Sequence, residues 1–460
     1  MSFPLTETLA RFALDTRFDD IPGEVIERGK IHILDALGLA LAGSIAPPAQ
    51  MTRDHVLSVC AADGDASILG TGHRAPARFA ALCNGTSIHA DNFDDTNPQA
   101  DAARNGGIHA TGPVLATALA LGESLNIDGR ELMTAYHMGV EIACKLSHAI
   151  DQRHYSDGFH TTGTLNAFGC AATAGRIIGL DESGISGALA FAASAASGIR
   201  RNFGSIVEVL HAGHAAECGV AAADFAARGL EGAADALEGP AGYIEAAGGG
   251  YDESIIDGRL GAPWAFSNPG MWIKPHPSGA LTHPALAATG DLLREEDIRS
   301  DEVAAIRVRT NDRIRKILAS ELPTTGLQAK FSMEFCVAIL ILDGRAGLSE
   351  FTDQVVSRPD VMAMMDRVDY GGYSDPEPGF TNVTTLIEID LSDGRTLSGR
   401  ADYARGSTNA PMSFDDVTEK FRGCASHADW PDDKAAQIIE FVGNLDTHPS
   451  LAGLVGALTR

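Results

Sequence analysis

Apolar residues over roughly the first 260 positions recur at helical spacing among many alanines and glycines. The pattern predicts long helices, with one end at Gly179 and a new start capped by Asp181. Small residues on every face of these helices indicate that they pack closely inside the protein. The predicted helices are Glu24–Ala42, Val114–Leu125, Arg130–His148, Gly163–Ile178 and Ala215–Ala227.

The pattern changes after Pro269, where apolar and polar residues begin to alternate. Alternation is typical of strands with one buried face, and Asp393-Gly394-Arg395 is typical of a tight turn between two of them. A helical stretch near 330–342 separates the first strand from the others. The predicted strands are Val303–Arg309, Thr384–Leu391 and Thr396–Tyr403.

Length and patterning together predict two domains, because 460 residues exceed one ordinary hydrophobic core. We expect a fold that is mainly α with an α+β second domain. The large all-helical domain spans 1–267 and is completed by the helical C-terminal stretch 406–460. A smaller α+β lid domain spans 268–405.

The acidic composition narrows the possible partners. The net charge of −26 argues against general binding to nucleic acid or to an anionic membrane. No apolar run has the length of a membrane span, and the N-terminal stretch lacks the basic and apolar regions of a secretory signal, so we expect a cytoplasmic protein. The seven cysteines are dispersed without a C-x-x-C pair, which indicates reduced thiols and offers no ligand set for an iron–sulfur cluster.

Two histidines share a local pattern: His109 begins H-A-T-G and His160 begins H-T-T-G, each directly ahead of an Ala/Gly-rich helical stretch. A histidine there lies beside unsatisfied backbone N–H groups and the positive end of a helix dipole. That place suits a carboxylate ligand, with the imidazole able to exchange a proton. Local capping or packing is the alternative for either residue, but the repeated pattern makes both candidates for an active site.

The segment His89–Thr96 is the densest polar stretch in an apolar region. The segment is compatible with a hard-cation site formed by Asp91, Asp94 and Asp95, or with a solvated loop. The sequence lacks the H-E-x-x-H motif that would indicate a zinc site. Gly248–Gly250 lacks the preceding strand and following helix of a nucleotide-binding loop. We therefore expect neither a metal nor a cofactor.

Lys274 is one of only seven lysines among the 35 basic residues, and it lies between an apolar pair and a proline-rich loop that contains Ser278. A lysine held in this way can pair with a substrate carboxylate, or act as a base if desolvation lowers its pKa. An exposed surface lysine is the alternative. Arg200, Arg201 and His211 are further cationic or polar candidates.

These motifs resemble the 2-methylcitrate dehydratase (MmgE/PrpD) family, which includes cis-aconitate decarboxylases and iminodisuccinate epimerase. The resemblance implies a helical domain with a smaller α+β lid, a cleft between them, and usually a dimer. It also implies active-site roles for Thr96, His109, His160 and Lys274. The matching stretches are Ile31–Gly43, Asn84–Thr96, Gly158–Thr164, Arg200–Gly204, Leu210–Ala216, Lys274–His283, Ala329–Met333 and Pro411–Phe421.

Three positions depart from the family pattern. Asn92 stands where the dehydratase and decarboxylase members typically carry an aspartate, Glu208 where they carry a lysine, and Phe335 where they carry a tyrosine. A glutamate in place of a lysine is poorly matched to a tricarboxylate. These departures favour proton exchange on a smaller dicarboxylate over the family's lyase chemistry.

The sequence therefore favours a cofactor-independent epimerase or racemase that abstracts a proton α to a carboxylate of a small di- or polycarboxylic acid, similar to iminodisuccinate epimerase. The alternatives are a lyase, either a 2-methylcitrate-like dehydratase or a cis-aconitate-like decarboxylase, and a non-catalytic family member. We expect a homodimer. The predicted catalytic residues are His109, His160, Lys274 and Tyr155, and the predicted substrate-binding residues are Asn92, Thr96, Arg200, Arg201, Glu208, His211 and Ser278.

Overall fold

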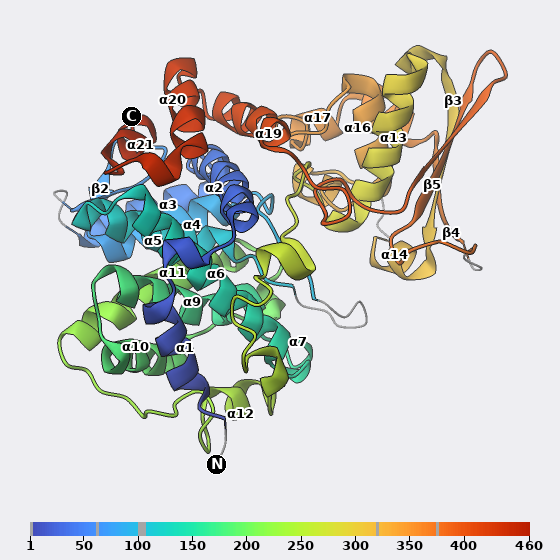
Figure 1. The fold of residues 1–460 in the computed structure, drawn as a ribbon. Helices are drawn as coiled ribbons and strands as arrows, with labels where there is room; N and C mark the ends of the chain where they lie inside the picture. The colour runs from blue at the N-terminus through green and yellow to red at the C-terminus, as the bar shows by residue number, and fades with distance from the viewer. Residues whose placement is uncertain (1–2, 61–63, 100–106, 319–321, 374–376) are drawn as a thin grey trace. The chain divides into compact units, whose positions relative to one another are not determined.

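The chain forms two compact units, Met1–Trp272 with Ser413–Arg460 and Ile273–Met412. The structure is a computed structural model that describes residues 3–60, 64–99, 107–318, 322–373 and 377–460. The larger unit is helical and the smaller one combines helices with a sheet (Figure 1), which confirms the predicted fold class.

The larger unit is built around α4, α5, α9 and α11, which pack against one another. Glycine permits this close approach: a Cβ on Gly213 in α11 would lie 2.2 Å from the hydroxyl oxygen of Thr86 in α4. Helix α19, the first helix of the C-terminal stretch 413–460, packs against α2 (Figure 1). The helices of this unit are α1 (Leu5–Asp15), α2 (Gly23–Gly43), α3 (Pro47–Val59), α4 (Ala77–His89), α5 (Thr111–Leu125), α6 (Gly129–Ala149), α7 (Arg153–Ser156), α8 (Thr161–Thr164), α9 (Asn166–Ile177), α10 (Glu182–Ala195), α11 (Ile206–Ala227), α12 (Tyr243–Gly248), α19 (Phe414–His427), α20 (Asp432–Gly443) and α21 (Ala452–Ala457), with a short ribbon of β1 (Ala66–Ser67) and β2 (Arg74–Ala75).

The smaller unit contains a four-stranded sheet in the order β4-β3-β5-β6, in which β4 is parallel to β3 and the other neighbours are antiparallel. Helices α13 and α16 cover one face of the sheet (Figure 1). The strands are β3 (Val303–Asn311), β4 (Val368–Tyr373), β5 (Thr385–Leu391) and β6 (Thr396–Ala401), and the helices are α13 (His283–Glu296), α14 (Asp312–Ile317), α15 (Gly326–Ala329), α16 (Met333–Asp343), α17 (Asp353–Val356) and α18 (Pro359–Met365).

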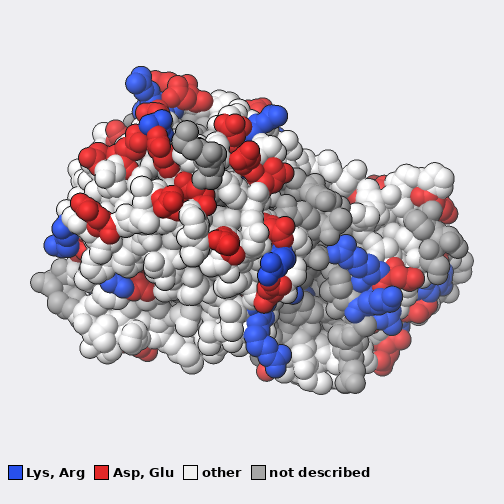
Figure 2. All heavy atoms as spheres, turned by 90° about the horizontal axis from the view of Figure 1, so that it is seen from below, with Lys and Arg blue, Asp and Glu red and all other residues white. Residues whose placement is uncertain are grey.

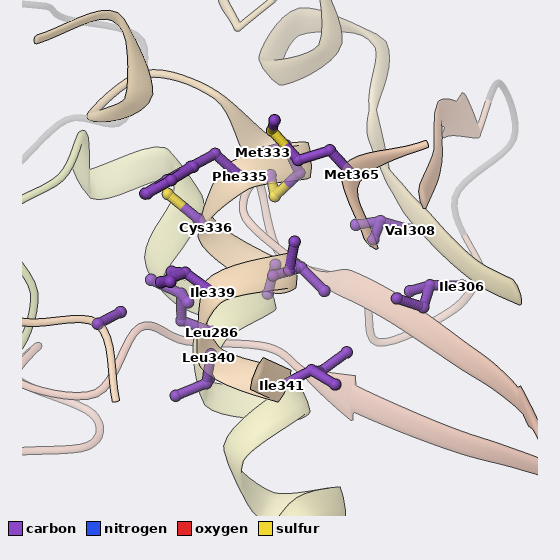
Figure 3. Packing of buried hydrophobic residues seen from close by; sticks show 14 of the residues in the cluster. Leu286, Ile306, Val308, Met333, Phe335, Cys336, Ile339, Leu340, Ile341 and Met365 are labelled. Atoms are coloured by element: carbon purple, nitrogen blue, oxygen red, sulfur yellow. The ribbon is translucent and has the colours of Figure 1, made fainter. Parts of the chain in front are cut away.

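Phe335 lies in the hydrophobic core of the smaller unit, among the apolar side chains of α16 and the sheet (Figure 3). Its side chain is fully buried, and its ring contacts Phe351 edge to face with centroids 5.3 Å apart. Packing against the core therefore explains a phenylalanine here. The departure at Phe335 therefore gives no structural support to the preference for proton exchange over lyase chemistry.

The surface view agrees with the acidic composition: acidic side chains gather over the drawn face of the larger unit (Figure 2). Within the described residues, no single helix combines the length and apolarity needed to cross a membrane. Helices α2 and α3 meet those two requirements only when taken together, and they are bent by 78° relative to each other.

Candidate active site

A short loop after α4 carries several of the polar side chains of the candidate site. Helix α4 ends at His89, and the chain then turns through Asn92, which has the left-handed backbone (φ 52°) that asparagine tolerates well. The loop continues through Asp94 and Asp95 to Thr96, where the backbone pairs with Trp272 through two N–H···O hydrogen bonds of 2.8 Å. The loop is therefore anchored at both ends, and the side chains of Asp94 and Asp95 are buried in the unit.

His89 lies between two carboxylates. Its Nδ1 is 2.8 Å from Oδ2 of Asp94, and its Nε2 is 3.6 Å from Oε1 of Glu208, which lies in the first turn of α11. The His89 and Asp94 side chains are almost completely buried, whereas Glu208 is 20% exposed. The arrangement resembles an imidazolium held between two anions, with Glu208 on the more open side.

The electrostatics of this group follow from its packing. Burial alone would lower the pKa of His89, but the negative charges of Asp94 and Glu208 and the hydrogen bond with Asp94 outweigh it and raise the pKa to about 10. Burial alone would raise the pKa of Glu208, but the positive charge of the nearby His89 lowers it overall. His89 is thus a fixed cation at neutral pH rather than a titrating base.

His109 is held by backbone and hydroxyl groups. Its Nδ1 is 2.6 Å from the carbonyl oxygen of Asp95, which can only accept, so Nδ1 carries the proton. The Thr96 hydroxyl oxygen and Oδ1 of Asp94 lie 3.2 and 3.4 Å from the same nitrogen. The lone pair of the neutral ring is therefore on Nε2, which is the nitrogen that can gain or lose a proton in a reaction.

The backbone of His109 is also fixed. Its N–H donates to the hydroxyl of Thr162 in α8 at 3.2 Å, and Asn166 in α9 donates to its carbonyl oxygen at 2.8 Å. Behind it, the Asp95 carboxylate lies 2.6 Å from Nδ1 of His32 and accepts from the Thr111 hydroxyl. Buried hydrogen bonds therefore fix both the backbone of His109 and the orientation of its imidazole ring.

His160 and His211 form a second imidazole pair. Their Nδ1 atoms are 2.9 Å apart, so one ring donates and the other accepts. A close backbone approach makes the pair possible, because a Cβ on Gly163 would lie 2.6 Å from the carbonyl oxygen of Ser197. The Phe203 ring packs edge to face against His160.

Both members of this pair favour the neutral form. Burial, followed by repulsion from the protonated forms of His89 and His109, lowers the pKa of His160 to about 2. Burial likewise lowers the pKa of His211. The pair can therefore offer hydrogen bonds to a ligand without carrying charge at neutral pH.

The His89 and His109 rings and the His160–His211 pair belong to one cluster. The ring centroids of His89 and His109 are 5.0 Å apart, and those of His89 and His160 are 6.3 Å apart. The structure thus brings together five predicted site residues, which are Thr96, His109, His160, Glu208 and His211. Sequence reasoning did not include His89 or Asp94 in the site, although both belong to the polar stretch that stood out in the sequence.

Other predicted site residues lie elsewhere or make other contacts. The Arg200 guanidinium stacks 3.8 Å over the Tyr155 ring and donates to the Tyr155 carbonyl oxygen at 2.8 Å. Arg201 is exposed. Lys274 and Ser278 belong to the smaller unit, where Lys274 is buried and the Ser278 hydroxyl is 2.9 Å from that of Thr282.

His89, Asp94 and His109 offer three donor atoms within 4.8 Å of one another, a spacing compatible with a metal ion. Two of the ring nitrogens already have partners, however: Nδ1 of His89 pairs with Asp94, and Nδ1 of His109 donates to the Asp95 carbonyl. The hydrogen-bonding pattern is that of an acid–base site, in which fixed partners set the protonation state of each imidazole.

A buried acid–base cluster of histidines and carboxylates in a helical unit defines the class of site, and sequence comparison defines the family. The MmgE/PrpD N-terminal domain matches residues 7–255, and the MmgE/PrpD C-terminal domain matches residues 276–447. The chain belongs to the MmgE/PrpD family of enzymes.

Relatives with known activities cover nearly the whole chain. A cis-aconitate decarboxylase of Homo sapiens is 27% identical over 96% of this chain and 92% of its own length. A cis-aconitate decarboxylase of Aspergillus terreus is 23% identical over 99% and 96%, respectively. The mitochondrial 2-methylcitrate dehydratase of Yarrowia lipolytica is 26% identical, but over only 25% of this chain.

These relatives overturn the reaction favoured from the sequence. The expected epimerase or racemase activity is wrong, because the full-length similarities are to decarboxylases and support the lyase alternative. The prediction depended on departures at Asn92, Glu208 and Phe335, and the structure places Phe335 in a hydrophobic core.

Proposed function

We propose that the chain is a lyase that removes a carboxyl group from a small unsaturated polycarboxylic acid of the cis-aconitate type. The similarity to cis-aconitate decarboxylases over 96% of the chain carries this proposal. The histidine cluster supports it, because the reaction needs a positioned proton donor and no redox chemistry.

In this reaction His109 is the proton donor. When an unsaturated acid of this type loses CO2, the carbon–carbon bond to the departing carboxyl breaks and its electron pair forms a new double bond to the adjacent alkene carbon, while the original π pair moves to the far alkene carbon. That far carbon then takes up one proton, so each turnover consumes one proton. Since Nδ1–H of His109 is held on the Asp95 carbonyl, Nε2 first takes up a proton from solvent, which makes the ring an imidazolium, and then delivers that proton to the carbon and returns to the neutral form.

The surrounding groups have supporting roles in this proposal. The protonated His89 offsets the charges of Asp94 and Glu208, which would otherwise oppose negative charge developing nearby, and a fixed charge needs no reorganisation during the reaction. The neutral His160–His211 pair orients the substrate by hydrogen bonds. Lys274 and Tyr155 as catalytic residues, the homodimer and the cytoplasmic location all stay predictions.

The experiment compares two acids. Purified protein is incubated separately with cis-aconitate and with 2-methylcitrate, and released CO2 and the enoate absorbance are followed together. We expect CO2 and an unsaturated diacid that has one carboxyl group fewer than cis-aconitate. Gain or loss of water without CO2 would instead make the protein a dehydratase, and turnover of neither acid would refute the proposed substrate class.

A further inference from the structure

A buried ion pair joins two helices that are far apart in the sequence. Asp35 in α2 and Lys420 in α19 lie in the sequence motifs Ile31–Gly43 and Pro411–Phe421, neither of which has a role in the proposed reaction. The Lys420 Nζ is 2.6 Å from Oδ1 of Asp35, and their side chains are only 5% and 2% exposed. Pairs this deeply buried contribute little net stability, because desolvation offsets the attraction.

Lys420 has a second partner that points to its role. Its Nζ donates to the carbonyl oxygen of Phe93 at 3.0 Å, and it lies 3.8 Å from the centroid of the Phe93 ring. Phe93 immediately precedes Asp94 and Asp95, whose contacts set the protonation of His89 and His109. The Lys420 ammonium in α19 therefore holds the backbone at Phe93, directly before the two aspartates that contact His89 and His109.

The charge of Asp35 also interacts with His32 and Asp95, which lie behind His109. Burial raises the pKa of Asp35 to about 6, with Lys420 and His32 opposing the rise and Asp95 adding to it. His32 is the residue that contacts the Asp95 carboxylate. Both members of the ion pair are thus coupled to groups behind His109, one through a backbone carbonyl and the other through charge.

We propose that Lys420 is a positioning residue of the active site: neutralised by Asp35, its ammonium fixes the Phe93 carbonyl and thereby the segment 93–96 that orients His89 and His109. Its effect on turnover rests on the proposed lyase function, but its effect on the loop does not. Lys420 touches no reacting atom, so its removal acts through the loop.

A set of four variants separates positioning from simple charge balance. Lys420→Met removes the ammonium and leaves Asp35 unpaired. The double variant Asp35→Leu with Lys420→Met replaces the pair by apolar side chains, which restores charge balance without restoring the donor to Phe93. Lys420→Arg keeps a cation and donors. Arg422→Met removes an exposed cation from the same helix and is the matched control.

Each variant is measured for kcat, KM, Tm and hydrogen exchange of the backbone amides in 90–97. We expect Lys420→Met to lower kcat about 100-fold with KM close to the wild-type value, as for a misplaced acid–base group. The double variant regains Tm but not kcat, and exchange in 90–97 is faster than wild type in both. Lys420→Arg recovers most of the rate, and Arg422→Met behaves as wild type.

Recovery of kcat by the double variant would overturn the proposal, because Lys420 would then serve only to neutralise Asp35. Unchanged exchange in 90–97 would overturn it as well. If Lys420→Met does not fold, the charge-balanced double variant decides the question alone. A wild-type protein that releases no CO2 would refute the proposed function, while the exchange measurement would still test the positioning role.

Discussion

The carbonyl oxygen of Asp95 accepts a hydrogen bond from Nδ1 of His109 at 2.6 Å. Because a carbonyl cannot donate, this contact decides the tautomer of His109 and assigns proton exchange to Nε2. Because the acceptor is a backbone atom, no side-chain substitution removes it. Substitutions can change the His109 tautomer only through side chains that position the loop or that contact Nδ1.

Thr96 is the most direct of these groups, since its hydroxyl oxygen lies 3.2 Å from the same Nδ1. We expect Thr96→Val to lower kcat about tenfold, because the loss of one hydrogen bond to an ionising group corresponds to about 1.4 kcal/mol. Thr96→Ser keeps the hydroxyl and serves as the control. Equal rates for the two variants would show that the hydroxyl does not support His109.

Glu208 should affect both the charge of His89 and the choice of substrate. Replacing it by glutamine removes one of the two carboxylates that raise the pKa of His89, so that pKa should fall, while Asp94 keeps it above the ordinary value. A nitrogen-detected NMR titration measures the change. An unchanged His89 titration would mean that the 3.6 Å contact carries no interaction.

The same substitution should lower KM for a tricarboxylate several-fold, since two like charges in a partly solvated site repel by roughly 1 kcal/mol or more. Glu217→Gln is the matched control, because Glu217 lies on the same helix and pairs with Arg78 at 2.8 Å. A higher KM in Glu208→Gln than in Glu217→Gln would show that Glu208 assists binding rather than opposing it.

The His160–His211 pair should stay uncharged. Because burial and the neighbouring histidines lower the pKa of His160 to about 2, its ring nitrogens should show no titration between about pH 4 and pH 8. Assignment by His160→Gln identifies the signals. Observation of an ordinary histidine titration near neutral pH would mean that the pair opens in solution.

Phe335 tests whether a family departure matters for the reaction. The side chain is fully buried in the core of the smaller unit, so Phe335→Tyr adds a hydroxyl where apolar groups surround it. We expect a loss of about 1–3 kcal/mol of stability and no change in kcat of the folded protein. A rise in kcat would restore a role for a phenol at this position. Phe351→Tyr, in the contacting ring, is a useful comparison.

Patterning predicted the fold well because helices and alternating strands leave a local signal. The helices α2, α5 and α6 and the strand β5 all appeared in the sequence as periodic stretches. Strand β4 did not, because its sequence V-D-Y-G-G-Y contains two glycines, and it is specified by parallel pairing with β3 across a long connection.

The candidate site was predictable only in part. His109 and His160 stood out through their shared position ahead of helices. The contact of His89 with Glu208 joins α4 to α11, and sequence spacing carries no signal for a pair so far apart. The reaction was predicted wrongly because a departure from the family was counted without knowing its surroundings, as Phe335 in its hydrophobic core illustrates.

The most direct test of a lyase with His109 as proton donor follows carboxyl-labelled cis-aconitate in heavy water, with wild-type protein and with His109→Asn. Asparagine keeps a donor near the position of Nδ1 and lacks Nε2. We predict labelled CO2 and one deuteron on carbon in the wild-type product, and a rate about 10²- to 10⁴-fold lower in the variant with Tm unchanged. Wild-type protein that exchanges deuterium without releasing CO2, or a variant as fast as wild type, would contradict this account.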